Sequence, residues 1–219
     1  MGKIKNDKLH IGCFDRPIDG WINTDITPHI WISRIPGLPL MLRTLGRMSQ
    51  ERYLQHKTGI FRKVEYLDLL TKFPYPDNSF RRVFSSHVVE HIPRRRAPLV
   101  LAEIFRVLVP GGILRTAVPN LTFFVNRYSP ERADEFVREV FAIEQQSEKN
   151  RHHWMYSDYT LALLHQNAGF VDVNICGFRD GACENIDELD NRPEQTLFLE
   201  GRKPIPGHAT FIKPAASTF

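Results

Sequence analysis

The side chains of this 219-residue chain that are suited to moving protons gather in two places. His91, His153 and Tyr156 are the candidate catalytic bases, and His152 stands beside them. Imidazole is the side chain whose ordinary pKa lies closest to neutral pH, where a general base works best. Each of these residues alone is more often a packing or surface residue. Their spacing therefore gives a hypothesis of acid–base chemistry without naming a reaction.

One of these histidines belongs to a pattern that some metal-dependent hydrolases share. Residues 87–91 (HVVEH) match the His-x-x-Glu-His arrangement of inverted zinc peptidases. That chemistry needs both histidines on one face of a helix. Pro93 follows two residues later and is unfavourable inside a helix. We therefore predict no zinc peptidase here and assign no metal to the chain.

Short strands and helices alternate along the chain and must position these residues. Strands are predicted over residues 8–13, 21–26, 64–67, 82–86, 113–118, 170–175 and 195–200. Helices are predicted over 34–57, 97–108, 121–128, 130–148 and 158–168, with a polar loop over 179–193. This alternation predicts an α/β fold, a Rossmann-like three-layer sandwich with a mostly parallel sheet and helices on both faces. We expect one domain over residues 1–219, with its core at about 8–202 and an irregular tail at 203–219.

Small or polar residues stand at the ends of four predicted strands. These are Gly12, Asp25, Asp68 and Ser86. Ligands of open parallel sheets bind beyond the carboxyl ends of the strands, so this convergence predicts a binding site. The connection from Gly12 to Trp21 is too short for a crossover helix, which needs about a dozen residues. We therefore expect the first strand–helix–strand unit to be abbreviated.

Blocks of sequence in a fixed order resemble the class I S-adenosylmethionine-dependent methyltransferases, in particular the small type 11-like members. The blocks are LHIGC (9–13) with GWINTD (20–25), FPYPDNSF (73–80), SHVVEHI (86–92), EIFRVLVPGG (103–112), VPN (118–120), and HWMY (153–156) with LLHQNAGF (163–170). The resemblance implies S-adenosylmethionine as the cofactor and methyl transfer as the reaction. The cofactor-binding residues that it implies are Gly12, Cys13, Phe14, Asp25, Ile26, Asp68, Leu69, Ser86 and His87.

Within this set, each acidic residue has a distinct expected partner. Asp25 would accept hydrogen bonds from the ribose hydroxyls, and Asp68 would accept one from the adenine amino group. Gly12 would let the backbone approach the methionine part. The family usually has a second glycine where this chain has Phe14, and often an aspartate where it has Arg81. A degenerate, non-catalytic binding or scaffold protein with the methyltransferase fold therefore stays open as the alternative.

The methyl acceptor is not specified by these residues. Small members of the family often act on glycans or small metabolites, so we expect a small-molecule, sugar or glycan acceptor. Arg94-Arg95-Arg96, Arg34, Arg43 and Arg47 could form a basic rim for an acidic acceptor, or a solvated surface. The net charge is only +4 and no aromatic–basic motif is present, which disfavours nucleic acid. The apolar segment at 30–48 is interpreted as a core-covering helix, with a lid or a membrane-surface helix as alternatives.

The composition of the chain indicates the cellular compartment in which we expect it. The three cysteines do not pair evenly and are predicted to be free thiols of a reducing compartment. The first eight residues are polar and lysine-rich, with no apolar region after them that would indicate a signal peptide. No apolar run approaches the roughly 18 residues of a transmembrane helix. Cytoplasm is therefore the expected location, and the oligomeric state is left open.

Overall fold

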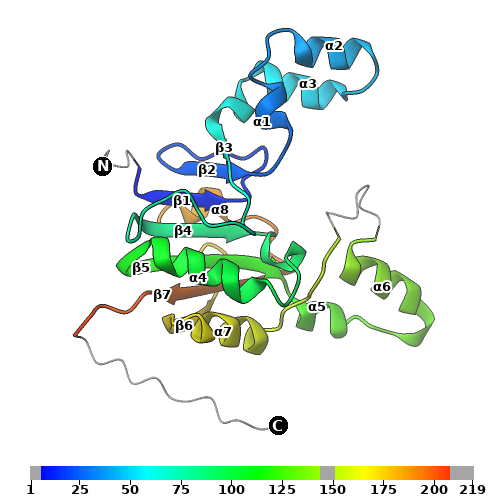
Figure 1. The fold of residues 1–219 in the computed structure, drawn as a ribbon. Helices are drawn as coiled ribbons and strands as arrows, with labels where there is room; N and C mark the ends of the chain where they lie inside the picture. The colour runs from blue at the N-terminus through cyan, green and yellow to red at the C-terminus, as the bar shows by residue number, and fades with distance from the viewer. Residues whose placement is uncertain (1–5, 144–150, 208–219) are drawn as a thin grey trace.

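In the computed structural model, which describes residues 6–143 and 151–207, the centre of the molecule is one twisted sheet (Figure 1). Its strand order is β3-β2-β1-β4-β5-β7-β6. The strands are β1 (Lys8–Ile11), β2 (Ile22–Asp25), β3 (Val64–Tyr66), β4 (Phe80–Ser86), β5 (Leu108–Pro119), β6 (Val171–Cys176) and β7 (Thr196–Arg202). Strand β7 is antiparallel to both of its neighbours, and the other adjacent pairs are parallel. The predicted α/β architecture is confirmed.

The helices agree with the sequence where their ends are strongly marked. They are α1 (His29–Ile32), α2 (Leu38–Thr44), α3 (Gln50–Lys57), α4 (Ala97–Val107), α5 (Leu121–Val125), α6 (Ala133–Phe141), α7 (Asp158–Asn167) and α8 (Ile186–Leu189), with 3₁₀ turns η1 (Ile60–Lys63), η2 (Val89–His91) and η3 (Pro130–Arg132). The helices predicted at 97–108 and 158–168 are confirmed. Asn120 caps α5 and Ser157 caps α7, each by accepting a hydrogen bond from a backbone N–H in the first turn.

Two predicted helices are wrong in extent. The single helix predicted at 34–57 is two short helices, α2 and α3, because Gly37 before α2 and Gly46 between them take left-handed backbone angles. The helix predicted at 130–148 begins as a 3₁₀ turn and ends at Phe141, where Ala142 is left-handed. The last part of that prediction falls in 144–150, outside the described residues.

The two faces of the sheet are covered by unequal layers. Residues alternate along β4, so that Val83 packs into the large core beneath α4 and α7, while Phe84 faces the other side. There it packs with Trp21 and Leu189, which come from the β1–β2 connection and from α8. No helix follows β1, as the short connection predicted. The connection from 177 to 195 covers much of the area that a first crossover helix would occupy.

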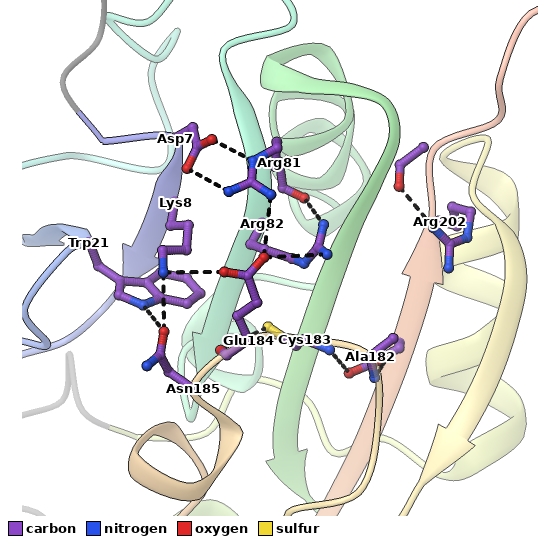
Figure 2. Close-up of polar contacts among 12 residues, drawn as sticks. Asp7, Lys8, Trp21, Arg81, Arg82, Ala182, Cys183, Glu184, Asn185 and Arg202 are labelled. Carbon is purple, nitrogen blue, oxygen red and sulfur yellow. Dashed lines mark hydrogen bonds and ion pairs between the residues drawn. The ribbon is translucent and has the colours of Figure 1, made fainter.

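Polar contacts tie this connection to the sheet (Figure 2). Lys8 Nζ lies 3.3 Å from Glu184 Oε2, and the Trp21 indole N–H donates to Asn185 Oδ1 at 3.1 Å. Arg81 pairs with Glu184 as well as with Asp7. Arg81 lies near the amino end of β4, opposite to the edge where ligands bind. Arg81, where the family often has an aspartate, therefore makes this contact at the edge away from the predicted cofactor site.

A buried arginine anchors the same connection. Arg115 of β5 is fully buried, and its guanidinium donates to Asp190 Oδ1 at 2.9 Å and to Glu200 Oε1 at 3.0 Å. The carbonyl oxygens of Gly177 and Asp180 accept two more hydrogen bonds at 3.0 Å each. A buried charge of this kind is tolerated only when its donors are satisfied, and four different acceptors do so here.

The segment at 30–48 does not cover the core as a helix. Ile30 and Met48 are buried at its ends, but α2 buries none of its residues. Trp31, Ile35 and Leu45 are each more than half exposed. In Figure 1 this part, with α1, α2 and α3, projects beyond the β3 edge of the sheet. The interpretation as a core-covering helix is therefore wrong for the middle of the segment.

Two further expectations can be compared with the structure. Cys13, Cys176 and Cys183 are free, as predicted. Among the described residues, none of the helices is both long enough and apolar enough to cross a bilayer.

Candidate functional site

The sheet register brings the predicted strand-end residues to one edge. Ile11 of β1 lies between Thr24 of β2 and Ser85 of β4, so the residues that follow these strands are neighbours. The backbone N–H of Gly12 donates to the Thr24 carbonyl oxygen at 2.8 Å. Asp25 pairs in register with Tyr66 of β3. The convergence predicted from the sequence is therefore present.

Asp25 is held with its carboxylate at this edge. Its Oδ2 accepts from the Phe14 backbone N–H at 3.0 Å, and its Oδ1 accepts from that of Thr27 at 2.7 Å. Burial raises the pKa of Asp25, and the backbone hydrogen bonds oppose this rise. A carboxylate has about four acceptor positions, so two remain for ribose hydroxyls. Ile26 beside it is exposed and offers apolar surface at the same edge.

The space beside Gly12 is occupied by the chain itself. Gly12 has φ +70°, and a Cβ added there would lie 2.2 Å from Cγ2 of Val88. Glycine is therefore required here because Val88 comes close. The predicted reason, close approach of the cofactor's methionine part, is not what the described residues show.

The two residues after Gly12 turn their side chains away from the edge. Cys13 is buried against Ile30, and burial raises the pKa of its thiol. The Phe14 ring packs 6.2 Å from that of Phe61, with the Arg52 guanidinium 4.5 Å above it. Phe14 thus does not fill the methionine pocket, although it replaces a glycine of the family pattern. The Cys13 side chain is buried, whereas the Phe14 ring stays partly exposed.

The ends of β3 and β4 supply the remaining predicted residues. Asp68 and Leu69 are half-buried, and Asp68 Oδ1 accepts from the Leu70 backbone N–H at 2.9 Å. Ser86 is half-buried at the end of β4. His87 follows with a left-handed φ of 52°, and its Nε2 lies 3.2 Å from Thr196 Oγ1 at the start of β7. The structure brings these positions to the same edge as Asp25.

The HVVEH segment is not a helix that could hold two zinc ligands one turn apart. Only Val89–His91 is helical, as a single 3₁₀ turn. Glu90 is fully buried, and neither of its carboxylate oxygens has a hydrogen-bond partner. His87 Nδ1 lies 3.3 Å and His91 Nε2 lies 3.9 Å from Glu90 Oε1. The peptidase geometry is therefore absent, and a buried carboxylate lies between two histidines.

The three predicted catalytic residues occupy different environments. Tyr156 is fully buried, its hydroxyl lacks a partner, and burial raises its pKa to about 12. A phenol with this pKa stays protonated near neutral pH and is poorly suited to act as a base. His153 is exposed and lines a hollow of about 550 Å³ with Arg94 and Arg95. His91 lies nearest to the end of β4, beside Glu90.

A second hollow, of about 450 Å³, opens where β4 and β5 end. His87, Pro119, Phe124, His152 and Gln195 contribute to its wall. The rest of the lining is charged or small and comes from α6 and the β7 approach: Glu135, Arg138, Glu139, Ala142 and Arg192. The contribution of α6 to this hollow was not predicted, because the helical pattern of its residues does not indicate which strand end the helix lies against.

Parts of the chain are similar in sequence to known methyltransferases. Residues 47–116 match the family model described as a methyltransferase domain. Over 69 residues the chain is 32% identical to sterol 24-C-methyltransferase of Pneumocystis carinii (strain B80), and over 50 residues it is 46% identical to probable methyltransferase ltbC of Aspergillus luteorubrus. These alignments take in 31% and 22% of this chain and only 18% of each relative.

A solved structure extends the similarity to nearly the whole chain. A SAM dependent methyltransferase from Archaeoglobus fulgidus superposes with a TM-score of 0.50 at 19% identity, covering 92% of this chain and 87% of that one. At this identity the likeness concerns the fold alone. Residues 47–116 therefore match a methyltransferase domain, the chain has the fold of class I S-adenosylmethionine-dependent methyltransferases, and S-adenosylmethionine is the cofactor that these findings support.

Proposed function

We propose that this chain transfers the methyl group of S-adenosylmethionine to a small-molecule, sugar or glycan acceptor. The observation that carries the proposal is the 450 Å³ hollow at the ends of β4 and β5. It lies next to the edge where Gly12 and Asp25 meet, because β1 is hydrogen-bonded to β4. A donor at that edge and an acceptor in the hollow would be adjacent, which is what a direct transfer needs.

The residues of the chain would act mainly by alignment. In the reaction, a nucleophilic atom of the acceptor bonds to the methyl carbon while the carbon–sulfur bond breaks, and its electron pair stays on sulfur. Holding the two reactants in line supplies several kcal/mol of the barrier by itself. Asp25 would hold the ribose, Asp68 and Leu69 the adenine, and Ser86 would lie near the methionine end. The mixed charges of Glu139 and Arg192 around the hollow suit a polar, hydroxyl-bearing acceptor.

Calorimetric titration with S-adenosylmethionine, and separately with S-adenosylhomocysteine, tests the cofactor site. We expect micromolar binding of both, weakened at least tenfold by Asp25→Ala. Asp19→Ala is the matched control, because Asp19 is an exposed aspartate in the β1–β2 connection that forms a surface ion pair with Lys63. No binding at millimolar ligand, or equal weakening by both variants, would contradict the proposal.

The alternative, a degenerate protein that does not bind the cofactor, has one observation in its favour. Val88 fills the space beside Gly12 that the methionine part would approach. The Val88→Ala variant separates the two hypotheses. If the wild-type chain binds S-adenosylmethionine, Val88 must yield to it and the enzyme is favoured. If only the Val88→Ala variant binds it, the native site is closed and the scaffold function is favoured.

We also propose that α1 and α2 make peripheral contact with an anionic lipid surface. Trp31, Ile35 and Leu45 expose apolar side chains there. Residues 26–50 contain no aspartate or glutamate, whereas Arg34 and Arg43 are among their basic residues. An apolar surface flanked by basic residues is typical of helices that lie in a membrane interface.

A further inference from the structure

We infer that Glu90, His91 and His152 form a binding site for one divalent transition-metal ion, with Zn²⁺ the best fit. One ligand atom from each of these side chains lies within 4.8 Å of the other two. At a tetrahedral zinc ion with bond lengths of roughly 2.0–2.2 Å, two ligand atoms are about 3.3–3.6 Å apart. Side-chain rotations that move these atoms by on the order of 1 Å would bring all three to one ion.

The histidines are already arranged as metal ligands usually are. His91 Nδ1 lies 3.0 Å from the Arg151 carbonyl oxygen, and His152 Nδ1 lies 2.8 Å from that of Val140. A carbonyl oxygen can only accept, so each Nδ1 carries the hydrogen and each Nε2 keeps a lone pair. Metal-binding histidines almost always donate their other N–H to a carbonyl or carboxylate in this way. Backbone carbonyl oxygens thus fix the same tautomer in both histidines, which leaves both Nε2 atoms able to bind one ion.

Glu90 is the independent observation that points to a cation. Its side chain is fully buried and both oxygens lack a hydrogen-bond partner. A buried carboxylate without partners is costly, and a bound cation is one of the few groups that compensates it. His87 Nδ1 lies 3.3 Å from Oε1, and the other ring nitrogen lies 3.2 Å from Thr196 Oγ1. His87 therefore lies beside the carboxylate, on the side of the strand end, without a hydrogen bond to it.

The backbone brings the third ligand to the first two. The Glu90 carbonyl oxygen accepts from the His153 N–H at 2.7 Å and from the Trp154 N–H at 3.2 Å. These bonds hold the segment before Tyr156 against the η2 turn. They place His152 beside His91, with ring centroids 5.1 Å apart. The prediction of no metal rested on the HVVEH pattern alone. His152 stands 61 positions after His91, so the pattern does not include it.

The ligand types select the metal. Two imidazoles and one carboxylate suit Zn²⁺, whereas Mg²⁺ prefers oxygen ligands and keeps its waters. Three protein ligands also leave a coordination position open, as in catalytic zinc sites. His152 lines the 450 Å³ hollow, so the open position would be next to the proposed acceptor. If the proposed function holds, the ion would bind an acceptor oxygen and ease loss of its proton.

Metal binding can be measured without any methyl transfer. We would titrate the metal-free, full-length protein with ZnCl₂ against a competing chelator, and with CoCl₂ while recording the visible absorption of bound Co²⁺. The expected result is one ion per chain, with MgCl₂ unable to compete at millimolar concentration. Glu90→Gln and His152→Ala should each weaken zinc binding by at least about 100-fold, since even outer contacts of metal sites are worth 10–100-fold.

His153→Ala is the matched control, because His153 is the next residue, exposed, and outside the cluster. It should bind zinc as the wild type does. Thermal unfolding of each metal-free variant shows whether it has folded. Zinc should raise the Tm of the wild type and of His153→Ala, but not that of Glu90→Gln. Absence of saturable zinc binding, or unchanged affinity in folded Glu90→Gln and His152→Ala, overturns the inference.

The failure of this site and the failure of the proposed function are distinguishable. Loss of S-adenosylmethionine binding with intact zinc binding leaves the metal site standing in a protein that is not a methyltransferase. Cofactor binding with no zinc binding leaves the methyltransferase proposal standing and removes the metal site.

Discussion

Replacement of Gly12 by alanine should destabilise the protein through one identifiable contact. The left-handed backbone at φ +70° costs a residue with a Cβ about 1–2 kcal/mol. The new Cβ would lie 2.2 Å from Val88 Cγ2, and overpacking of this kind costs about 1–3 kcal/mol more. We therefore expect Gly12→Ala to lower the free energy of unfolding by about 2–5 kcal/mol.

Val88→Ala in the same chain should recover the second part of that loss. Val88 Cβ lies 3.5 Å from the added Cβ, an ordinary contact, so removal of the two methyl groups relieves the overlap. The double variant should thus be more stable than the sum of the single variants predicts, by about 1–3 kcal/mol. Urea unfolding followed by circular dichroism gives the unfolding free energy of the wild type, the two single variants and the double variant. The four free energies can be compared directly if their m values are equal.

Gly20 supplies the matched control. It has φ +81°, and an added Cβ would meet no atom within 4 Å. Gly20→Ala should therefore lose only the backbone part and show no coupling to Val88→Ala. If Gly12→Ala is no more destabilising than Gly20→Ala, or if its coupling to Val88→Ala is below about 0.5 kcal/mol, the inferred contact does not exist in solution.

Three further predictions concern burial and charge. His165 is fully buried, and burial lowers its pKa from 6.5 to about 4, so the unfolding free energy of the wild type should fall as the pH drops from 6.5 toward 4. In His165→Gln this fall should be smaller by up to about 1.4 kcal/mol per pH unit. Equal slopes of unfolding free energy against pH in the two proteins would contradict the prediction. Arg115→Met should cost about 3–5 kcal/mol because it removes the buried cation beside the buried Asp190 carboxylate. Adding Asp190→Asn should restore part of this loss in urea titrations, and simple additivity of the two changes would argue against the pair. The wild type should co-sediment with anionic vesicles and not with neutral ones, and Trp31→Ala with Leu45→Ser should reduce this; equal sedimentation by both proteins would refute the lipid contact.

The order and type of the main elements could be predicted from the sequence. Short apolar runs between turn residues marked the strands, and the helix at 97–108 was marked by its apolar face and by Pro110. The strand-end positions Gly12 and Asp25 followed from the rule that ligands bind beyond the carboxyl ends of parallel strands. These predictions depended on local pattern and on the general rules for parallel sheets.

Features that depend on contacts between distant segments were decided only by the tertiary structure. The sequence does not show that Val88 fills the space at Gly12, because that contact needs β1 and β4 side by side. It does not show why Arg115, a charged residue in the middle of an apolar strand, can be buried. The acceptors that satisfy it come from the connection at 177–195 and from β7, all more than 60 residues away along the chain.

The cluster of Glu90, His91 and His152 at the candidate site also depends on contacts between distant segments. The sequence by itself determined that a glutamate and two histidines stand close together after β4. Whether they form a site depended on His152, which reaches them only because the Glu90 carbonyl oxygen holds the segment at 153–154. Composition and spacing thus fixed which chemical groups are available and which strand ends they follow. Packing decided which of these groups share a buried volume, because burial and ligand geometry are properties of residues that meet in space.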